Sequence, residues 1–239
     1  MNEAIQRLKA ATDAAKTIVF FGGAGVSTES GIPDFRSVDG LYHQKYDYPP
    51  ETILSHSFFM HRTEEFYRFY RDKMLFLDAE PNAAHKKLAQ WEAEGRLNAV
   101  ITQNIDGLHQ KAGSKKVLEL HGSVLRNHCM QCGAAYPVSA ITAAKGLPRC
   151  EKCGGLIKPD VVLYEEALDG DVMEEAVRCI QEADVMIIGG TSLAVYPAAG
   201  LVQYFRSGTL ALVNRSETPL DARADIVVHE NIGEVFSAL

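Results

Sequence analysis

Residues 22–36, with the sequence GGAGVSTESGIPDFR, carry the groups best suited to binding a nucleotide. They directly follow an apolar run, 17–21, which predicts a buried β-strand. A glycine turn after a strand presents backbone N–H groups at the start of the next helix, where a pyrophosphate can bind. Gly23 and Gly25 would allow close approach, and Ser27 and Thr28 could cap the helix or bond a phosphate. Thr28 also stands where a dinucleotide-binding turn has its third glycine, so the turn alone leaves an ordinary connection open.

A carboxylate, an aromatic ring and a guanidinium stand side by side at Asp34, Phe35 and Arg36, just past the glycine turn. One interpretation of these residues is an ordinary turn with a surface ion pair. The other is a lid that covers a bound ring and holds a second charged group. The three residues by themselves leave both interpretations open.

Four further apolar runs, at 99–101, 118–120, 184–188 and 210–213, predict buried strands that end in polar or glycine-rich segments. Those segments contain Gln103, Asn104, Ile105, Asp106, His121, Gly190, Thr191, Ser192 and Asn214. In open α/β sheets, ligands bind at the carboxyl ends of the strands, where amides and carboxylates suit ribose hydroxyls and a carboxamide. Singly, an aspartate could be only a helix cap and a histidine only a core residue. Together the strand ends predict a nucleotide site.

The cysteines predict a metal site. Cys129 and Cys132 form one C-x-x-C pair, Cys150 and Cys153 another, and seventeen residues separate the pairs. This spacing is typical of a tetrahedral four-cysteine zinc site, whose full shell leaves no position for a catalytic water. Two disulfides are the alternative, disfavoured because the sequence shows no secretion signal. Cys179 lies apart, in a predicted helix over 172–182, and we expect it to be a buried small hydrophobe.

Alternating strand and helix patterns predict an α/β fold with a doubly wound parallel sheet. Two stretches interrupt the alternation: 37–80, which is rich in aromatic residues, and 123–159, which holds the cysteine pairs. The net charge of −7 argues against primary binding of nucleic acid, and no apolar run is long enough to cross a membrane. With no targeting signal in view, we expect a cytoplasmic protein.

Taken together, these segments resemble the sirtuins, a family of NAD-dependent protein lysine deacylases. The matching segments are GAGVSTESGIPDFR at 23–36, TQNID at 102–106, HG at 121–122, the cysteine pairs, GTSL at 190–193 and Asn214. The resemblance implies one catalytic domain, 1–239, with a Rossmann-like large lobe and a small lobe. The large lobe would comprise about 1–36, 81–122 and 160–239, and the small lobe a helical module, 37–80, and a zinc module, 123–159.

The resemblance also implies the reaction: transfer of an acetyl group from lysine to the ADP-ribose of NAD. The products would be nicotinamide, O-acetyl-ADP-ribose and deacetylated protein, with His121 as the general base and one structural zinc ion on the four paired cysteines. The residues that it assigns to NAD are Gly23, Ala24, Thr28, Asp34, Phe35, Arg36, Gln103, Asn104, Ile105, Asp106, Gly190, Thr191, Ser192 and Asn214. Those that it assigns to the acetyl-lysine peptide are Val162, Leu163 and Tyr164. Removal of longer acyl groups and mono-ADP-ribosyl transfer are the alternatives; a non-catalytic zinc ribbon and a dehydrogenase fit less well.

Two positions depart from the family pattern. Glu165 stands where a glycine is common, and a glutamate would be strained there if the position needs a positive φ. Relatives that remove acidic acyl groups carry a tyrosine with an arginine three residues later. This chain has Tyr67 followed by Tyr70 at that offset, which favours acetyl over acidic acyl groups.

Overall fold

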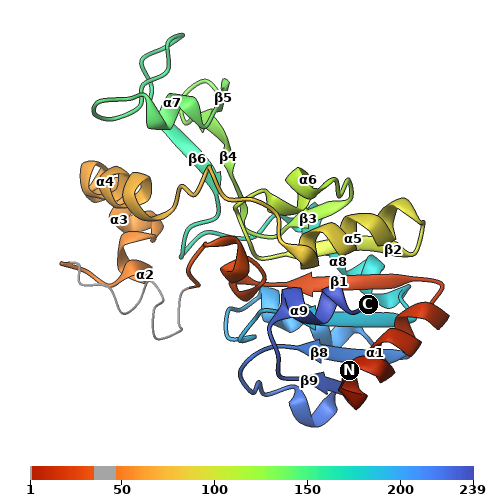
Figure 1. Ribbon diagram of the computed structural model, residues 1–239. Helices are drawn as coiled ribbons and strands as arrows, with labels where there is room; N and C mark the ends of the chain where they lie inside the picture. Colours follow the sequence, from red (N-terminus) through yellow and green to blue (C-terminus); the bar gives the residue numbers. More distant parts are fainter. Residues whose placement is uncertain (1, 35–46) are drawn as a thin grey trace.

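Within residues 2–34 and 47–239, which this computed structural model describes, six parallel strands form the larger of two sheets (Figure 1). Their spatial order is β3-β2-β1-β7-β8-β9, and every neighbouring pair runs parallel. The bounds in that order are Val117–Glu119, Leu97–Thr102, Ile18–Gly22, Val185–Gly189, Thr209–Val213 and Ile226–Val228. The chain winds outward from β1 on one side and from β7 on the other. The predicted doubly wound sheet is therefore confirmed, with its switch point between β1 and β7.

Helices cover both faces of this sheet, because its central strands are apolar on both faces. Strand β1 is buried along its whole length; Ile18 and Phe20 pack on one side, Val19 and Phe21 on the other. The first side is covered by α1 (Glu3–Ala14), α5 (Ala83–Ala93) and α9 (Ile232–Ser237). The second is covered by α8 (Gly170–Gln181) and the 3-10 helix η4 (Ala198–Tyr204). Buried Cys179 lies on α8, as predicted.

A second, smaller body of the structure lies to one side of the large sheet (Figure 1). It holds the antiparallel sheet β5-β4-β6 and four short helices. The strands are β4 (Gly122–Cys129), β5 (Ala135–Pro137) and β6 (Ile157–Val161), and the helices are α2 (Pro50–Ile53), α3 (His56–His61), α4 (Thr63–Lys73) and α7 (Ser139–Thr142). Aromatic side chains of α3 and α4, among them Phe59, Phe66 and Tyr70, share one core with Ile157 of β6. The Arg71 guanidinium also donates to the Ile141 and Gly146 carbonyls, which binds α4 to the cysteine-bearing segment.

The predicted helix after the glycine turn is wrong. Two single-turn 3-10 helices, η1 (Ala24–Val26) and η2 (Thr28–Ser30), take its place. The short helix α6 (Leu108–Ala112) follows β2, and the 3-10 turn η5 (Asp221–Arg223) precedes β9. Within the described residues, no helix is both long and apolar enough to span a bilayer.

Candidate active site

A cavity of about 760 Å³ opens where the carboxyl ends of β1, β2, β7 and β8 meet the segment after β6. That volume lies in the range of small-molecule sites. Sixteen predicted site residues line it: Gly23, Ala24, Thr28, Asp34, Gln103, Asn104, Ile105, Asp106, His121, Val162, Leu163, Tyr164, Gly190, Thr191, Ser192 and Asn214. Phe35 and Arg36 lie outside the described residues. The structure therefore gathers at one cavity residues that lie far apart in the sequence, while their individual roles stay predictions.

The glycines of the turn allow β1 and β7 to approach each other beyond their last paired residues. The Gly25 N–H donates to the Gly190 carbonyl over 2.8 Å, and a Cβ on Gly25 would lie only 2.8 Å from the Gly190 Cα. Gly190 has φ +58, and a Cβ there would lie 2.3 Å from the Val26 nitrogen. A Cβ on Gly23 would in turn meet the Thr191 side chain. The glycines thus let the backbone after β1 contact the backbone after β7 directly, and these two segments line one side of the cavity.

Polar side chains from the β1 and β2 ends form one buried hydrogen-bond network. The Ser27 hydroxyl donates to an Asp106 carboxylate oxygen over 2.6 Å, and the Asn104 amide donates to the Ser27 oxygen over 3.1 Å. The other Asp106 oxygen accepts from the N–H of Leu108, the first residue of α6. Burial raises the pKa of Asp106, and the Ser27 hydrogen bond opposes that rise. The sequence indicated Ser27 only as a helix cap or phosphate ligand; its place beneath Asn104 and Asp106 was missed.

His121 lies on the cavity wall with its tautomer fixed by the backbone. Its Nδ1 lies 3.0 Å from the Gln103 carbonyl oxygen. Because a carbonyl can only accept, Nδ1 carries the proton, and Nε2 of the neutral ring is left as the basic nitrogen. Burial lowers the pKa of His121, against a smaller opposing effect of the Gln103 bond. The ring is therefore neutral near pH 7, as a general base must be.

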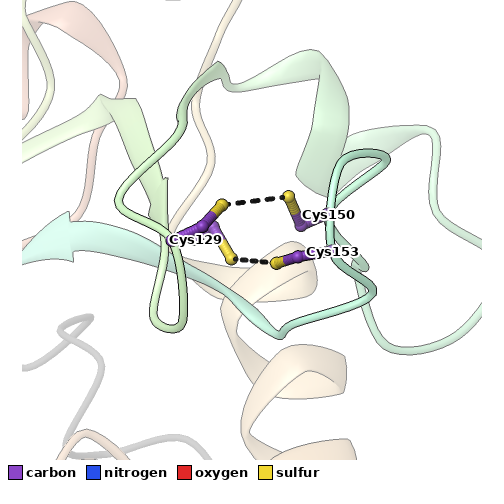
Figure 2. Close-up of side chains that lie close together, drawn as sticks. Cys129, Cys150 and Cys153 are labelled. Carbon is purple, nitrogen blue, oxygen red and sulfur yellow. Dashed lines mark hydrogen bonds between the residues drawn. The ribbon is translucent and has the colours of Figure 1, made fainter.

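The four paired cysteines lie around a common centre beside the end of β4. Figure 2 shows Cys129, Cys150 and Cys153 of this set. The Sγ atoms of Cys129 and Cys153 are 3.4 Å apart, those of Cys132 and Cys150 are 3.6 Å apart, and all four lie within 4.8 Å of one another. A disulfide needs about 2.05 Å, so the cysteines are not paired as disulfides. Sulfurs at about 2.3 Å from a tetrahedral Zn²⁺ would be separated by nearly 4 Å, which fits this set.

Tyr136 also belongs to the surroundings of this centre, and no sequence pattern predicted it. Its hydroxyl donates to the Cys150 sulfur over 3.1 Å and accepts from the Glu151 N–H. The Tyr136 hydrogen bond is the main cause that lowers the pKa of Cys150 to about 6. A thiol that ionises easily is a good zinc ligand.

The segment after β6 borders the cavity and is held from both sides. The Val162 N–H donates to the His121 carbonyl, and the Tyr164 N–H donates to the Leu54 carbonyl. The Tyr164 carbonyl accepts from the N–H of His56, at the start of α3. Glu165 has φ +74, so the left-handed conformation suspected from the sequence is present.

Tyr67 and Tyr70 belong to the aromatic core of α4 and do not line the cavity. Both are almost fully buried, and the Tyr67 hydroxyl donates to the Ile157 carbonyl. Burial raises the pKa of both phenols. Neither can meet a ligand without repacking this core. The apolar side chains that do line the cavity include Leu54, Met74, Phe76, Ile105 and Leu163.

Comparisons with known proteins agree with this arrangement. A model of the Sir2 family matches residues 23–197. The NAD-dependent protein deacetylase of Clostridium acetobutylicum is 56% identical, and the match covers 98% of this chain and 97% of that protein. A solved structure of Sir2 with a deacetylated p53 peptide and 3'-O-acetyl-ADP-ribose superposes with a TM-score of 0.90 at 40% identity, covering 98% of this chain and 96% of the other. One of Sir2 with a p53 peptide and NAD+ gives a TM-score of 0.86 at 39% identity, covering 99% and 96%.

Proposed function

The chain belongs to the Sir2 family, and we propose that its cavity is the active site of an NAD-dependent protein lysine deacetylase. With the consumption of one water, the enzyme transfers the acetyl group of acetyl-lysine to the ADP-ribose of NAD, giving nicotinamide, O-acetyl-ADP-ribose and deacetylated protein. One observation carries the assignment of the site: a neutral histidine whose basic nitrogen is Nε2 shares a wall with the glycine turn and the amide-rich end of β2. The large sheet with its helices would form one lobe, the small sheet with α2–α4 the other.

NAD would occupy the part of the cavity along the glycine turn. Bound there, it supplies a glycosidic bond whose cleavage makes C1′ of the ribose electrophilic. Gly23, Ala24 and Thr28 would contact the diphosphate, and Asn104 and Asp106 the nicotinamide ribose and carboxamide. These last two side chains are held in place by Ser27, so they need little reorganisation on binding.

The remaining predicted NAD residues would complete the binding site. Ile105 gives the nicotinamide ring an apolar contact, and Gly190, Thr191, Ser192 and Asn214 line the cavity at the ends of β7 and β8. The Gln103 amide donates to the Thr191 hydroxyl over 3.1 Å and so connects the two sides of the cavity. We keep Asp34, Phe35 and Arg36 as the lid of this site.

His121 would act as general base. Its Nε2 would accept a proton from a ribose hydroxyl, while the Nδ1–H continues to donate its hydrogen bond to the Gln103 carbonyl. The imidazolium formed by this proton transfer is stabilised, because its Nδ1–H already donates to the Gln103 carbonyl.

The zinc ion would be held by Cys129, Cys132, Cys150 and Cys153. Four thiolates fill its shell, so it supplies a structural cross-link between two hairpins and takes no part in proton transfer.

The acetyl-lysine peptide would add to the segment Val162, Leu163 and Tyr164 by main-chain hydrogen bonds. The burial of Tyr67 and Tyr70 and the apolar lining supplied by Leu54 and Met74 support acetyl over acidic acyl groups. We propose proteins as partners, without primary binding of nucleic acid, because the chain has a net charge of −7. The cytoplasmic location stays a prediction.

The test is mass spectrometry of a reaction with an acetyl-lysine peptide and NAD. We expect loss of the acetyl group only with NAD, together with one O-acetyl-ADP-ribose per lysine. His121→Ala should abolish deacetylation of the peptide. His61→Ala, a change at an exposed position on α3, should leave deacetylation unchanged. Transfer of ADP-ribose to protein with the acetyl group retained would establish the mono-ADP-ribosyltransferase instead.

A further inference from the structure

The segment that borders the peptide side of the cavity carries an unusual backbone conformation at Glu165. Within the described residues, positive φ at a non-glycine residue occurs only at Glu165 (φ 74) and Leu193 (φ 55). Both lie in segments that line the cavity. Left-handed backbone disfavours a glutamate, so surrounding contacts must hold this conformation.

The Glu165 side chain makes those contacts. One carboxylate oxygen accepts from the Ser57 N–H over 2.9 Å, and the other accepts from the Ser57 hydroxyl over 3.0 Å. Ser57 stands in the first turn of α3, so the carboxylate ties the cavity border to the helices of the smaller body. A glycine at position 165 would adopt the backbone more easily but could make neither bond.

The next residue, Glu166, strengthens the same connection. Its carboxylate lies 2.9 Å from His56 Nδ1 and accepts from the Leu163 N–H over 2.8 Å and from Lys158 Nζ over 3.1 Å. Two consecutive glutamates thus reach two consecutive residues of α3. Each bond is modest in solvent, but the set fixes where Leu163 to Glu166 lie relative to β6.

We propose that Glu165 is a positioning residue: through Ser57 it holds the segment 162–165 in the conformation that accepts the acetyl-lysine peptide. This inference rests on the proposed function. It assigns the carboxylate to Ser57, whose N–H and hydroxyl each donate to one of its oxygens, and not to the peptide. The segment gains preorganisation, so less ordering is needed when the peptide binds.

The test compares peptide affinity and kinetics in Glu165→Ala, Glu165→Gly and Ser57→Ala, with Glu174→Ala, an exposed glutamate of α8, as the matched control. Affinity is measured by fluorescence anisotropy of a labelled acetyl-lysine peptide. We expect both Glu165 variants to raise the peptide Kd and KM about five- to tenfold and Ser57→Ala about threefold. The NAD KM, the kcat at saturating peptide and the melting temperature should stay near the wild-type values. Adding Ser57→Ala to Glu165→Ala should cause little further loss.

Several outcomes would overturn the proposal. Unchanged peptide affinity in Glu165→Ala would do so, as would wild-type affinity in Glu165→Gly, which would mean that only the backbone conformation matters. An effect of Glu165→Ala that persists in full on the Ser57→Ala background, and that grows with the positive charge of the peptide, would show that the carboxylate contacts the peptide directly. A wild-type protein that binds no acetyl-lysine peptide would refute the proposed function along with this inference, whereas the other outcomes leave that function standing.

Discussion

Acid should destabilise this protein through a buried histidine on the sheet side of α5. His85 is fully buried, and its ring lies 4.7 Å, centroid to centroid, from that of His109 on α6, which packs against Phe20 of β1. His85 Nδ1 accepts from the Asn82 N–H in a capping box, which requires a neutral ring. Within the described residues, Nε2 of His85 and both ring nitrogens of His109 have no hydrogen-bond partner.

The expected magnitude follows from the shift in the His85 pKa. Burial lowers it from the ordinary 6.5 to about 4, and burial likewise lowers that of His109. Between pH 6.5 and about pH 4, His85 is protonated in the unfolded chain but stays neutral in the native protein, so the free energy of unfolding decreases as the pH falls. The full difference corresponds to about 3 kcal/mol, of which roughly 2 kcal/mol is lost between pH 7 and pH 5. His109 adds to the loss in the same direction.

The assay is urea unfolding at both pH values. His85→Gln keeps an acceptor for the Asn82 N–H but cannot titrate, so its loss of stability between pH 7 and pH 5 should be smaller than that of the wild type by about 2 kcal/mol. His61→Gln on α3, at an exposed position, serves as the control and should behave like the wild type. If His85→Gln loses as much stability as the wild type over this range, the reasoning is refuted.

Three further predictions concern the active site and the metal centre. Because burial lowers the pKa of His121, the acidic limb of kcat/KM should lie below pH 6.5; a limb above that value would contradict a neutral buried base. Cys153→Ser should lower the zinc content, measured by atomic emission, well below one per chain and should make the small sheet sensitive to protease; full retention would exclude the four-cysteine site. Gly190→Ala should lower the free energy of unfolding by about 3 kcal/mol or more and weaken NAD binding. Gly95→Ala is the control and should cost only about 1 kcal/mol, because a Cβ at Gly95 would meet nothing within 4 Å. Equal costs would mean that the backbone angle alone matters, and not the contact with the Val26 nitrogen.

Most of the large sheet was predictable because its central strands are buried on both faces. Each central strand is then a continuous apolar run, as at Phe20 and Ile187, and its polar continuation marks the ligand-binding edge. The small sheet carries no such signal. The residues of β5 are exposed or half-buried, so neither an apolar run nor a clean alternation identifies the strand.

The glycine turn shows why local patterns fail at the site itself. A helix was expected after Gly23, but the N–H of Gly25 pairs with the carbonyl of Gly190, and two 3-10 turns form instead. The link between Ser27 and Asp106 is equally invisible, since it joins residues 79 positions apart. Such pairings follow from the packing of β1 between β2 and β7, which no single segment encodes.

At the end of β2, one residue connects both sides of the cavity. The Gln103 N–H donates to the Gly22 carbonyl of β1, its amide reaches Thr191 after β7, and its carbonyl accepts from His121 Nδ1. Only the second of these bonds depends on the side chain. The tautomer of His121 is therefore set by the course of the backbone, and a substitution at position 103 would alter the link across the cavity while leaving the proton on Nδ1. The sheet geometry thus determines that Nε2 is the basic nitrogen of His121, because it places the Gln103 carbonyl beside Nδ1.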